Sequence, residues 1–149
     1  MIGRSSSDTI RKHAKALDDA IETEDIEGVL DFFSDHSTIE IFGITLKGKK
    51  EIRRGILWMY QKLGRIRFQP VTIMVEGNTF FEEFLMKTMP RKDTEFSIKA
   101  SEVLTFEDGI VNSLRLYLDR MALAMILARG PIEKIMVNQL DKMTLKGLV

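Results

Sequence analysis

The chain has 149 residues and no cysteine, and its 22 basic residues balance its 22 acidic ones. This length predicts one domain over residues 1–149, and the 44% of hydrophobic residues suffice to fill its core. The balanced charge argues against nucleic acid as the main partner, because phosphate binding needs a clustered basic excess, and the lack of cysteine excludes disulfides and thiolate metal sites.

Apolar residues at helical spacing predict a first helix that ends at about Thr23. The stripe consists of Ile10, Ala14, Leu17 and Ile21. His13 faces away from this stripe, so we expect it on the surface. A short second helix follows, with Asp25 as its predicted N-cap.

Alternation with β-branched residues then predicts a short strand over residues 37–43, and a second short strand lies between two glycines. A third helix over residues 49–64 ends at Gly64. Its predicted buried stripe consists of Ile52, Ile56, Met59, Tyr60 and Leu63. Trp58 is offset from the stripe, so we expect it at a rim, in contact with a ligand or a partner.

Strand-like segments separated by turn signals fill the next part of the chain: residues 65–77, 79–89, 95–106 and 109–118. Their short intervals predict antiparallel hairpins. Pro70 indicates that its strand lies at a sheet edge or carries a bulge. Because helices come first and a long antiparallel sheet later, the predicted fold class is α+β.

Helical patterns return after Asp119, with a break at Gly130 and Pro131. Four methionines lie in these segments: Met121, Met125, Met136 and Met143. Ordinary core packing is the plain interpretation, since methionine fills irregular gaps. A flexible lid over an apolar cavity or a dimer seam are the alternatives.

Targeting and metal-binding signals are missing from the sequence. The first ten residues lack an apolar h-region, and no apolar run approaches the roughly 18 residues of a membrane span. We therefore expect a cytoplasmic protein with no membrane partner. His13 and His36 are too few for a histidine metal cluster, so neither a metal nor a cofactor is predicted.

Two stretches resemble those of one superfamily. Residues 21–43, IETEDIEGVLDFFSDHSTIEIFG, and residues 106–120, FEDGIVNSLRLYLDR, are similar to the helix-to-strand entry and the last strand of the nuclear transport factor 2-like superfamily. Its members include ketosteroid isomerases, limonene epoxide hydrolases and SnoaL-like polyketide cyclases. The resemblance spans about Thr9 to Leu127 and is specific for the fold rather than for a function.

The resemblance implies a cone, in which a strongly curved antiparallel sheet wraps around the N-terminal helices, with additional C-terminal helices in this chain. An apolar pocket on the concave side would hold a small apolar or amphipathic molecule, with or without proton-transfer chemistry of isomerase, cyclase or hydrolase type. The convex side commonly forms a dimer. The alternative function is therefore a non-catalytic homodimeric adaptor that acts through its convex face.

The catalytic positions of the superfamily are largely aliphatic in this chain. The catalytic Asp of the epoxide hydrolases corresponds to Leu116. In the ketosteroid isomerases the base corresponds to Ile41, the oxyanion-hole Tyr to Leu17 and the protonated acid to Glu102. Only one of these three polar groups is present, which argues against steroid isomerisation by that constellation.

The last strand-like segment alternates strictly, which assigns its faces. Its apolar row consists of Leu114, Leu116 and Leu118, and its polar row consists of Arg115, Tyr117 and Asp119. The apolar row is expected to face the pocket, and Asp119 to be an N-cap or an interface residue. With Ile39, Ile41 and Trp58, the residues Leu116 and Leu118 would line a ligand pocket or, in the adaptor alternative, fill it.

Two glutamates interrupt apolar rows. Glu102 follows Ile98 and Ala100 on one strand face, and Glu82 lies between Phe80 and Phe84 on another. A buried carboxylate is costly unless it is protonated, paired or solvated. Glu102 and Glu82 are therefore the candidate catalytic acid and base, with Phe84 as a ligand contact. The alternatives are a bulge that reverses the face, a buried Arg beside Glu102, or a solvated rim position for Glu82.

Overall fold

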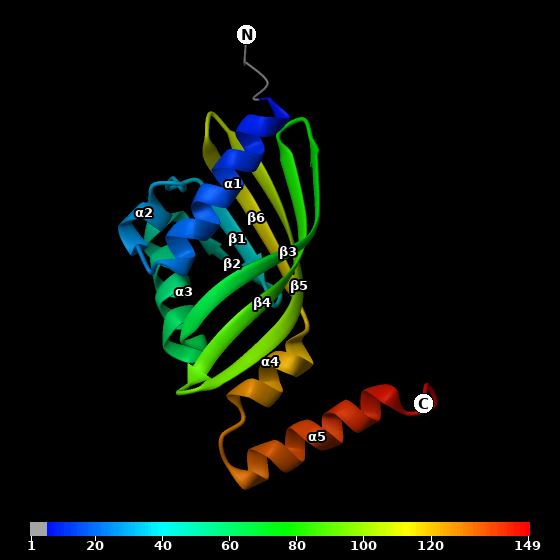
Figure 1. Ribbon diagram of the computed structural model, residues 1–149. Coiled ribbons are helices and arrows are strands. Elements are labelled where there is room, and N and C mark those ends of the chain that lie inside the picture. Colours follow the sequence, from blue (N-terminus) through cyan, green and yellow to red (C-terminus); the bar gives the residue numbers. More distant parts are fainter. Residues whose placement is uncertain (1–5) are drawn as a thin grey trace. The chain divides into compact units, whose positions relative to one another are not determined.

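The computed structural model describes residues 6–149, which form two compact units (Figure 1). The first unit ends at Leu118 and contains α1 (Ser7–Glu22), α2 (Ile26–Leu30), β1 (Thr38–Ile41), β2 (Ile44–Lys47), α3 (Gly48–Leu63), β3 (Arg65–Glu76), β4 (Thr79–Arg91), β5 (Thr94–Glu107) and β6 (Ile110–Leu118). The second, Asp119–Val149, contains α4 (Arg120–Leu127) and α5 (Pro131–Leu145). The element order matches the predicted α+β class, and the single domain over 1–149 stays a prediction.

Caps and stop signals fix the helices of the first unit. The Ser6 hydroxyl accepts the backbone N–H of Thr9 at the start of α1, and the predicted Asp25 cap accepts that of Gly28 at the start of α2. The helix α3 ends at Gly64, whose φ of 65° and tight approach to the carbonyl oxygen of Met89 exclude a side chain.

The strands of the first unit form one curved sheet in the order β2-β1-β6-β5-β4-β3 (Figure 1). The predicted hairpins are confirmed, since β3 to β6 pair antiparallel in succession, whereas β1 pairs parallel with β6. Both interpretations of Pro70 are correct: β3 is an edge strand, and its register shifts between Pro70 and Thr72. The helix α1 packs against the inner side of the sheet beside β3 and β4.

Strand register decides which side chains face α1. In β6, Leu114 is buried and Leu116 is half-buried, whereas Arg115 and Tyr117 are exposed, so the predicted alternation is confirmed. A core of side chains from α1, α2, α3 and the sheet packs on the concave side. His13 belongs beside this core rather than on the surface, because its half-buried ring packs 6.1 Å from that of Phe106.

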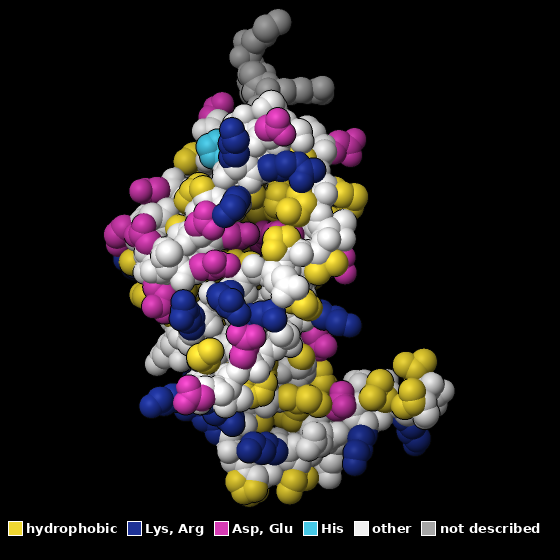
Figure 2. All heavy atoms as spheres, in the orientation of Figure 1, with side chains coloured by type: hydrophobic (Ala, Val, Ile, Leu, Met, Phe, Trp, Pro, Cys, Tyr) yellow, Lys and Arg dark blue, Asp and Glu magenta, His cyan; other side chains and the backbone are white. Residues whose placement is uncertain are grey.

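In the second unit, Asp119 is the N-cap of α4, where its carboxylate accepts the Ala122 N–H at 3.0 Å. Apolar residues of α5 are largely exposed (Figure 2), including Ile132, Ile135, Met136, Leu140 and Met143. Core packing is therefore wrong for Met136 and Met143, which are 58% and 71% exposed, while the lid and dimer-seam interpretations stay predictions. None of the helices in residues 6–149 is long and apolar enough to cross a membrane.

Candidate functional site

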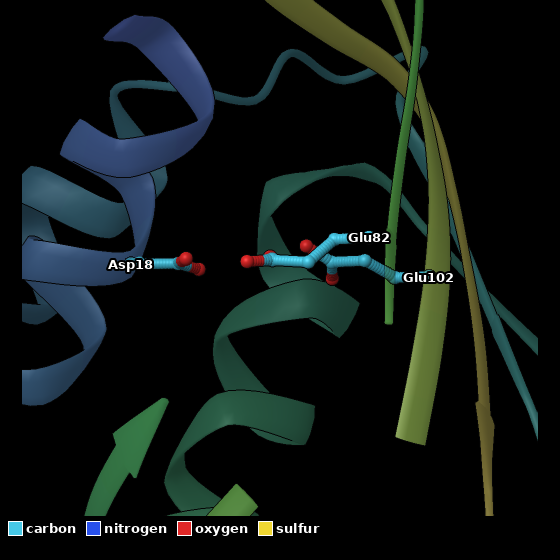
Figure 3. Close-up of side chains that lie close together, drawn as sticks. All are labelled: Asp18, Glu82 and Glu102. Carbon is cyan, nitrogen blue, oxygen red and sulfur yellow. The ribbon is translucent and has the colours of Figure 1, made fainter. Parts of the chain in front are cut away.

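Three carboxyl groups meet on the concave side of the sheet (Figure 3). Asp18 comes from α1, Glu82 from β4 and Glu102 from β5, and one oxygen of each lies within 4.8 Å of the others. We call this group the carboxyl cluster. The side chains point toward one another across the space between helix and sheet. Glu82 is 2% exposed and Glu102 is 8% exposed, so two of the three are buried.

The sheet register brings the two glutamates together. Glu82 and Glu102 are directly opposite each other in the β4–β5 pairing, and Ile73 and Leu116 continue the same cross-strand row on either side. The neighbouring pairs on this face are Phe80 with Leu104 and Phe84 with Ala100. The two carboxyl groups therefore lie within an apolar surface, where the charged form is disfavoured.

Two hydrogen bonds hold the last turns of α1 in place above the glutamates. The Glu22 carboxylate accepts the backbone N–H of Phe68 on β3 at 2.7 Å, and the Tyr60 hydroxyl on α3 donates to the carbonyl oxygen of Ile21 at 2.8 Å. Asp18 lies one turn before these contacts, at the edge of the buried stripe. The two bonds thus position its carboxyl group toward the sheet.

No basic side chain within residues 6–149 forms an ion pair with the carboxyl cluster. None of the three carboxyl side chains forms an ion pair or a hydrogen bond within these residues. The pKa values of all three are raised, and burial is the main cause. Burial raises the pKa of Asp18 to about 9, with Glu102 and Glu82 adding repulsion. It raises the pKa of Glu102 to about 8, with repulsion from Glu82, and that of Glu82 to about 7. Since the groups interact, they titrate as one cluster.

This geometry decides between the alternatives that the sequence leaves open for the glutamates. The β4–β5 pairing is regular from Thr79 to Thr88, so no bulge reverses the face of Glu102, and no Arg pairs with it among the described residues. The solvated rim position for Glu82 is wrong, because its side chain is buried. Glu82 and Glu102 do lie side by side, while their roles as catalytic acid and base stay a prediction.

Asp18 is the member that the sequence analysis misses. Its position, four residues after Ala14 and three before Ile21, places it beside the buried stripe of α1. That spacing is a usable signal: an acid flanked on one helix face by buried residues is a candidate for a buried position. The corresponding superfamily position considered above, Leu17, is the neighbouring residue and is buried in the core.

The predicted ligand contacts are distributed over three regions. Phe84 follows Glu82 on the same strand face, Leu116 pairs with Glu102, and Leu118 pairs with Ala100, so these three adjoin the carboxyl cluster. Ile39 and Ile41 lie on β1, where Ile39 pairs with Leu114. Trp58 lies on α3 with its side chain 40% exposed. Contact of these residues with a ligand stays a prediction.

Family membership follows from comparison with known proteins. The model of the SnoaL-like domain matches residues 14–113, which is more than half of the chain. The chain belongs to the SnoaL-like domain family. A comparison with curated proteins gave no match.

Solved structures similar to this SnoaL-like domain confirm its fold. One is an NTF2-like protein of unknown function from Burkholderia pseudomallei K96243, with a TM-score of 0.71 and 16% identity over 81% of this chain and 98% of that one. TerC, co-crystallised with polyporic acid, has a TM-score of 0.71 and 16% identity over 81% and 99% of the two chains. A hypothetical protein from Catenulispora acidiphila with a ketosteroid isomerase-like fold, in complex with trimethylamine, has a TM-score of 0.69 and 12% identity over 79% and 93%. The predicted NTF2-like fold is thus correct.

Proposed function

We propose that this SnoaL-like domain binds a small apolar or amphipathic molecule on its concave side and exchanges protons with it through the carboxyl cluster. One observation carries the proposal. Asp18, Glu82 and Glu102 converge on an otherwise apolar surface, and none of them forms an ion pair with a basic side chain among the described residues. Burying such groups costs stability, and proteins tolerate that cost mainly at functional sites.

The raised pKa values suit the cluster to acid–base chemistry near neutral pH. Glu82, with a pKa raised by burial to about 7, is the group most readily ionised and is the proposed base. Glu102, with a pKa of about 8, remains largely protonated beside it and is the proposed acid. A proton donor and acceptor side by side could enolise a carbonyl compound or assist the opening or closing of a ring.

The proposed binding surface continues from the cluster onto its apolar neighbours Phe84, Leu116 and Leu118, with Ile39, Ile41 and Trp58 farther away. In Figure 2, acidic side chains lie beside hydrophobic ones on the face of the first unit that α1 crosses. Polyporic acid in TerC and trimethylamine in the Catenulispora protein support the proposal, since proteins of this fold accommodate small organic molecules.

A fragment screen by protein-detected NMR tests this proposal. We expect ligands to shift the backbone amides around Glu82 and Glu102. We expect Glu102→Gln to weaken ligand binding by about tenfold, since the amide cannot give up a proton as the carboxylic acid does, and a ligand group left without its hydrogen-bond partner costs about 1–3 kcal/mol. Glu83→Gln is the matched control: Glu83 is exposed on the opposite strand face, where it accepts the Thr72 hydroxyl at 3.0 Å. Ligands that bind Glu102→Gln as tightly as the wild type would contradict the proposal.

The alternative is a homodimeric adaptor that acts through the convex face. Two large side chains favour it, because Met74 and Tyr117 are 57% and 56% exposed on this face, beside the exposed Arg115. We expect a dimer in sedimentation at micromolar concentration, and Tyr117→Asp to shift it toward monomer, because a charge would replace an apolar contact. Glu107→Gln, an exposed change at the end of β5, is the control. A protein that is monomeric at all concentrations tested would contradict the adaptor alternative.

A further inference from the structure

We infer that the ligand of the carboxyl cluster is a small hydrophobic amine, bound as its ammonium ion with the nitrogen between the oxygens of Asp18, Glu82 and Glu102. This inference rests on the proposed function, and it names the chemical class of the ligand. The acidic residues alone would not support it. The second observation is that Glu82 and Glu102, 2% and 8% exposed, have no polar partner within residues 6–149 and point into the cluster.

Charge favours a cationic ligand. Among the charged groups of α1, the carboxyl groups of Glu22 and Asp19 repel the charged form of Asp18, whereas Lys15 attracts it from an exposed position. Lys15, the basic residue nearest in sequence, is highly exposed and pairs with Asp19 instead. The Tyr60 hydroxyl donates a hydrogen bond to the carbonyl oxygen of Ile21 and is not directed at the cluster. An ammonium ion would supply the missing positive charge in a low-dielectric site, where that attraction is strongest.

Geometry favours an ammonium over a metal ion. A primary ammonium donates three hydrogen bonds, and at a donor–acceptor distance of about 2.8 Å in tetrahedral directions its acceptors lie about 4.6 Å apart. The cluster oxygens lie within 4.8 Å of one another, which accommodates that spacing. A hard divalent ion prefers six or more oxygens at about 2.0–2.6 Å. The cross-strand neighbours here supply none through their side chains: Ile73, Phe80, Phe84, Ala100, Leu104 and Leu116.

The same neighbours explain why the amine should be hydrophobic. Phe80 and Phe84 flank Glu82 on its strand, and both are buried. Their rings make the surroundings of the cluster apolar, which suits the carbon skeleton of a ligand bound there, and a ring face also attracts a cation that lies over it. An amine with an alkyl or aryl body therefore satisfies both the carboxyl groups and the surface around them.

Matched pairs of probes test the inference. We would titrate the protein with propylamine, hexylamine and benzylamine, and with the alcohol of the same skeleton in each case, by calorimetry at about pH 7.5. We expect each amine to bind about tenfold or more tightly than its alcohol, as a charge-assisted hydrogen bond is roughly twice as strong as a neutral one. The preference for the amine over the alcohol should disappear in a Glu82→Gln/Glu102→Gln double variant and remain unchanged in Glu83→Gln.

The pH dependence is a second readout that needs no variant. Cluster carboxyl groups must release a proton to pair with an ammonium, so amine affinity should rise between pH 5.5 and 8.5, while alcohol affinity should not. If the alcohols bind as tightly as the amines, the inference is overturned while the proposed function stands. If no probe binds, both are overturned. If Mn²⁺ binds at the cluster while amines bind no better than alcohols, the cluster is a metal site and the inference is wrong.

Discussion

Glu102→Gln should raise the free energy of unfolding at pH 8 by about 2–4 kcal/mol, since one pKa unit corresponds to about 1.4 kcal/mol. Burial, with repulsion from Glu82, raises the pKa of Glu102 from 4.5 to about 8. A raised folded-state pKa means that the contribution to stability is present below the unfolded value and is lost as pH rises through the folded one. The wild type should therefore lose stability relative to the variant between about pH 4.5 and 8.

Chemical denaturation of the wild type and Glu102→Gln at pH 4 and pH 8 measures this effect. At pH 4 Glu102 is mostly protonated in both the folded and the unfolded chain, so the two proteins should be nearly equally stable. Glu83→Gln is the control and should show little pH-dependent difference, because Glu83 is exposed. A variant that is instead destabilised by more than about 2 kcal/mol at neutral pH would show that Glu102 is ionised and held by a cation.

The faces of the strands were predictable because side chains alternate with a period of two. The apolar row of β6 and the row that contains Glu102 each follow from alternation, and the structure places both on the concave side. The contact between Glu82 and Glu102 was predictable only as a possibility. It depends on the pairing of β4 with β5. A turn signal near Pro90 indicates that these strands form a hairpin, but it does not determine which residues lie opposite each other.

Asp18 and His13 show why the rest could not be predicted. Both lie on α1 at the edge of its apolar stripe, where helical periodicity marks a residue as a candidate for burial but does not decide whether it is buried. Their burial depends on what α1 packs against: Asp18 faces the two glutamates, and His13 packs on Phe106. These contacts join residues about 64 to 93 positions apart in the chain, and single-sequence patterns carry no information about such pairings.

Leu116→Asp should destabilise the protein by about 3 kcal/mol or more at pH 7.5, because it adds a fourth carboxyl group to an apolar, uncompensated acidic site. Leu116 is half-buried and pairs directly with Glu102 across β5 and β6. Leu116→Asn, similar in shape to the aspartate but uncharged, is the matched control. It should cost less than Leu116→Asp, by a difference that grows as pH rises and the cluster ionises.

Leu116→Lys reverses the sign of the added charge and should separate electrostatics from packing. Its ammonium could reach the neighbouring carboxyl groups, so the cost at pH 7.5 should be smaller than that of Leu116→Asp and should decrease from pH 5.5 to 8, opposite to the aspartate. Tyr117→Asp, one residue along β6 and 56% exposed, should change the stability of the monomer little. Denaturant melts of the four variants give the comparison.

If aspartate, asparagine and lysine at position 116 reduce the stability equally across this pH range, the loss is one of packing alone. The carboxyl cluster would then have no electrostatic influence on its row, and a site that discriminates ligands by charge would lose its basis.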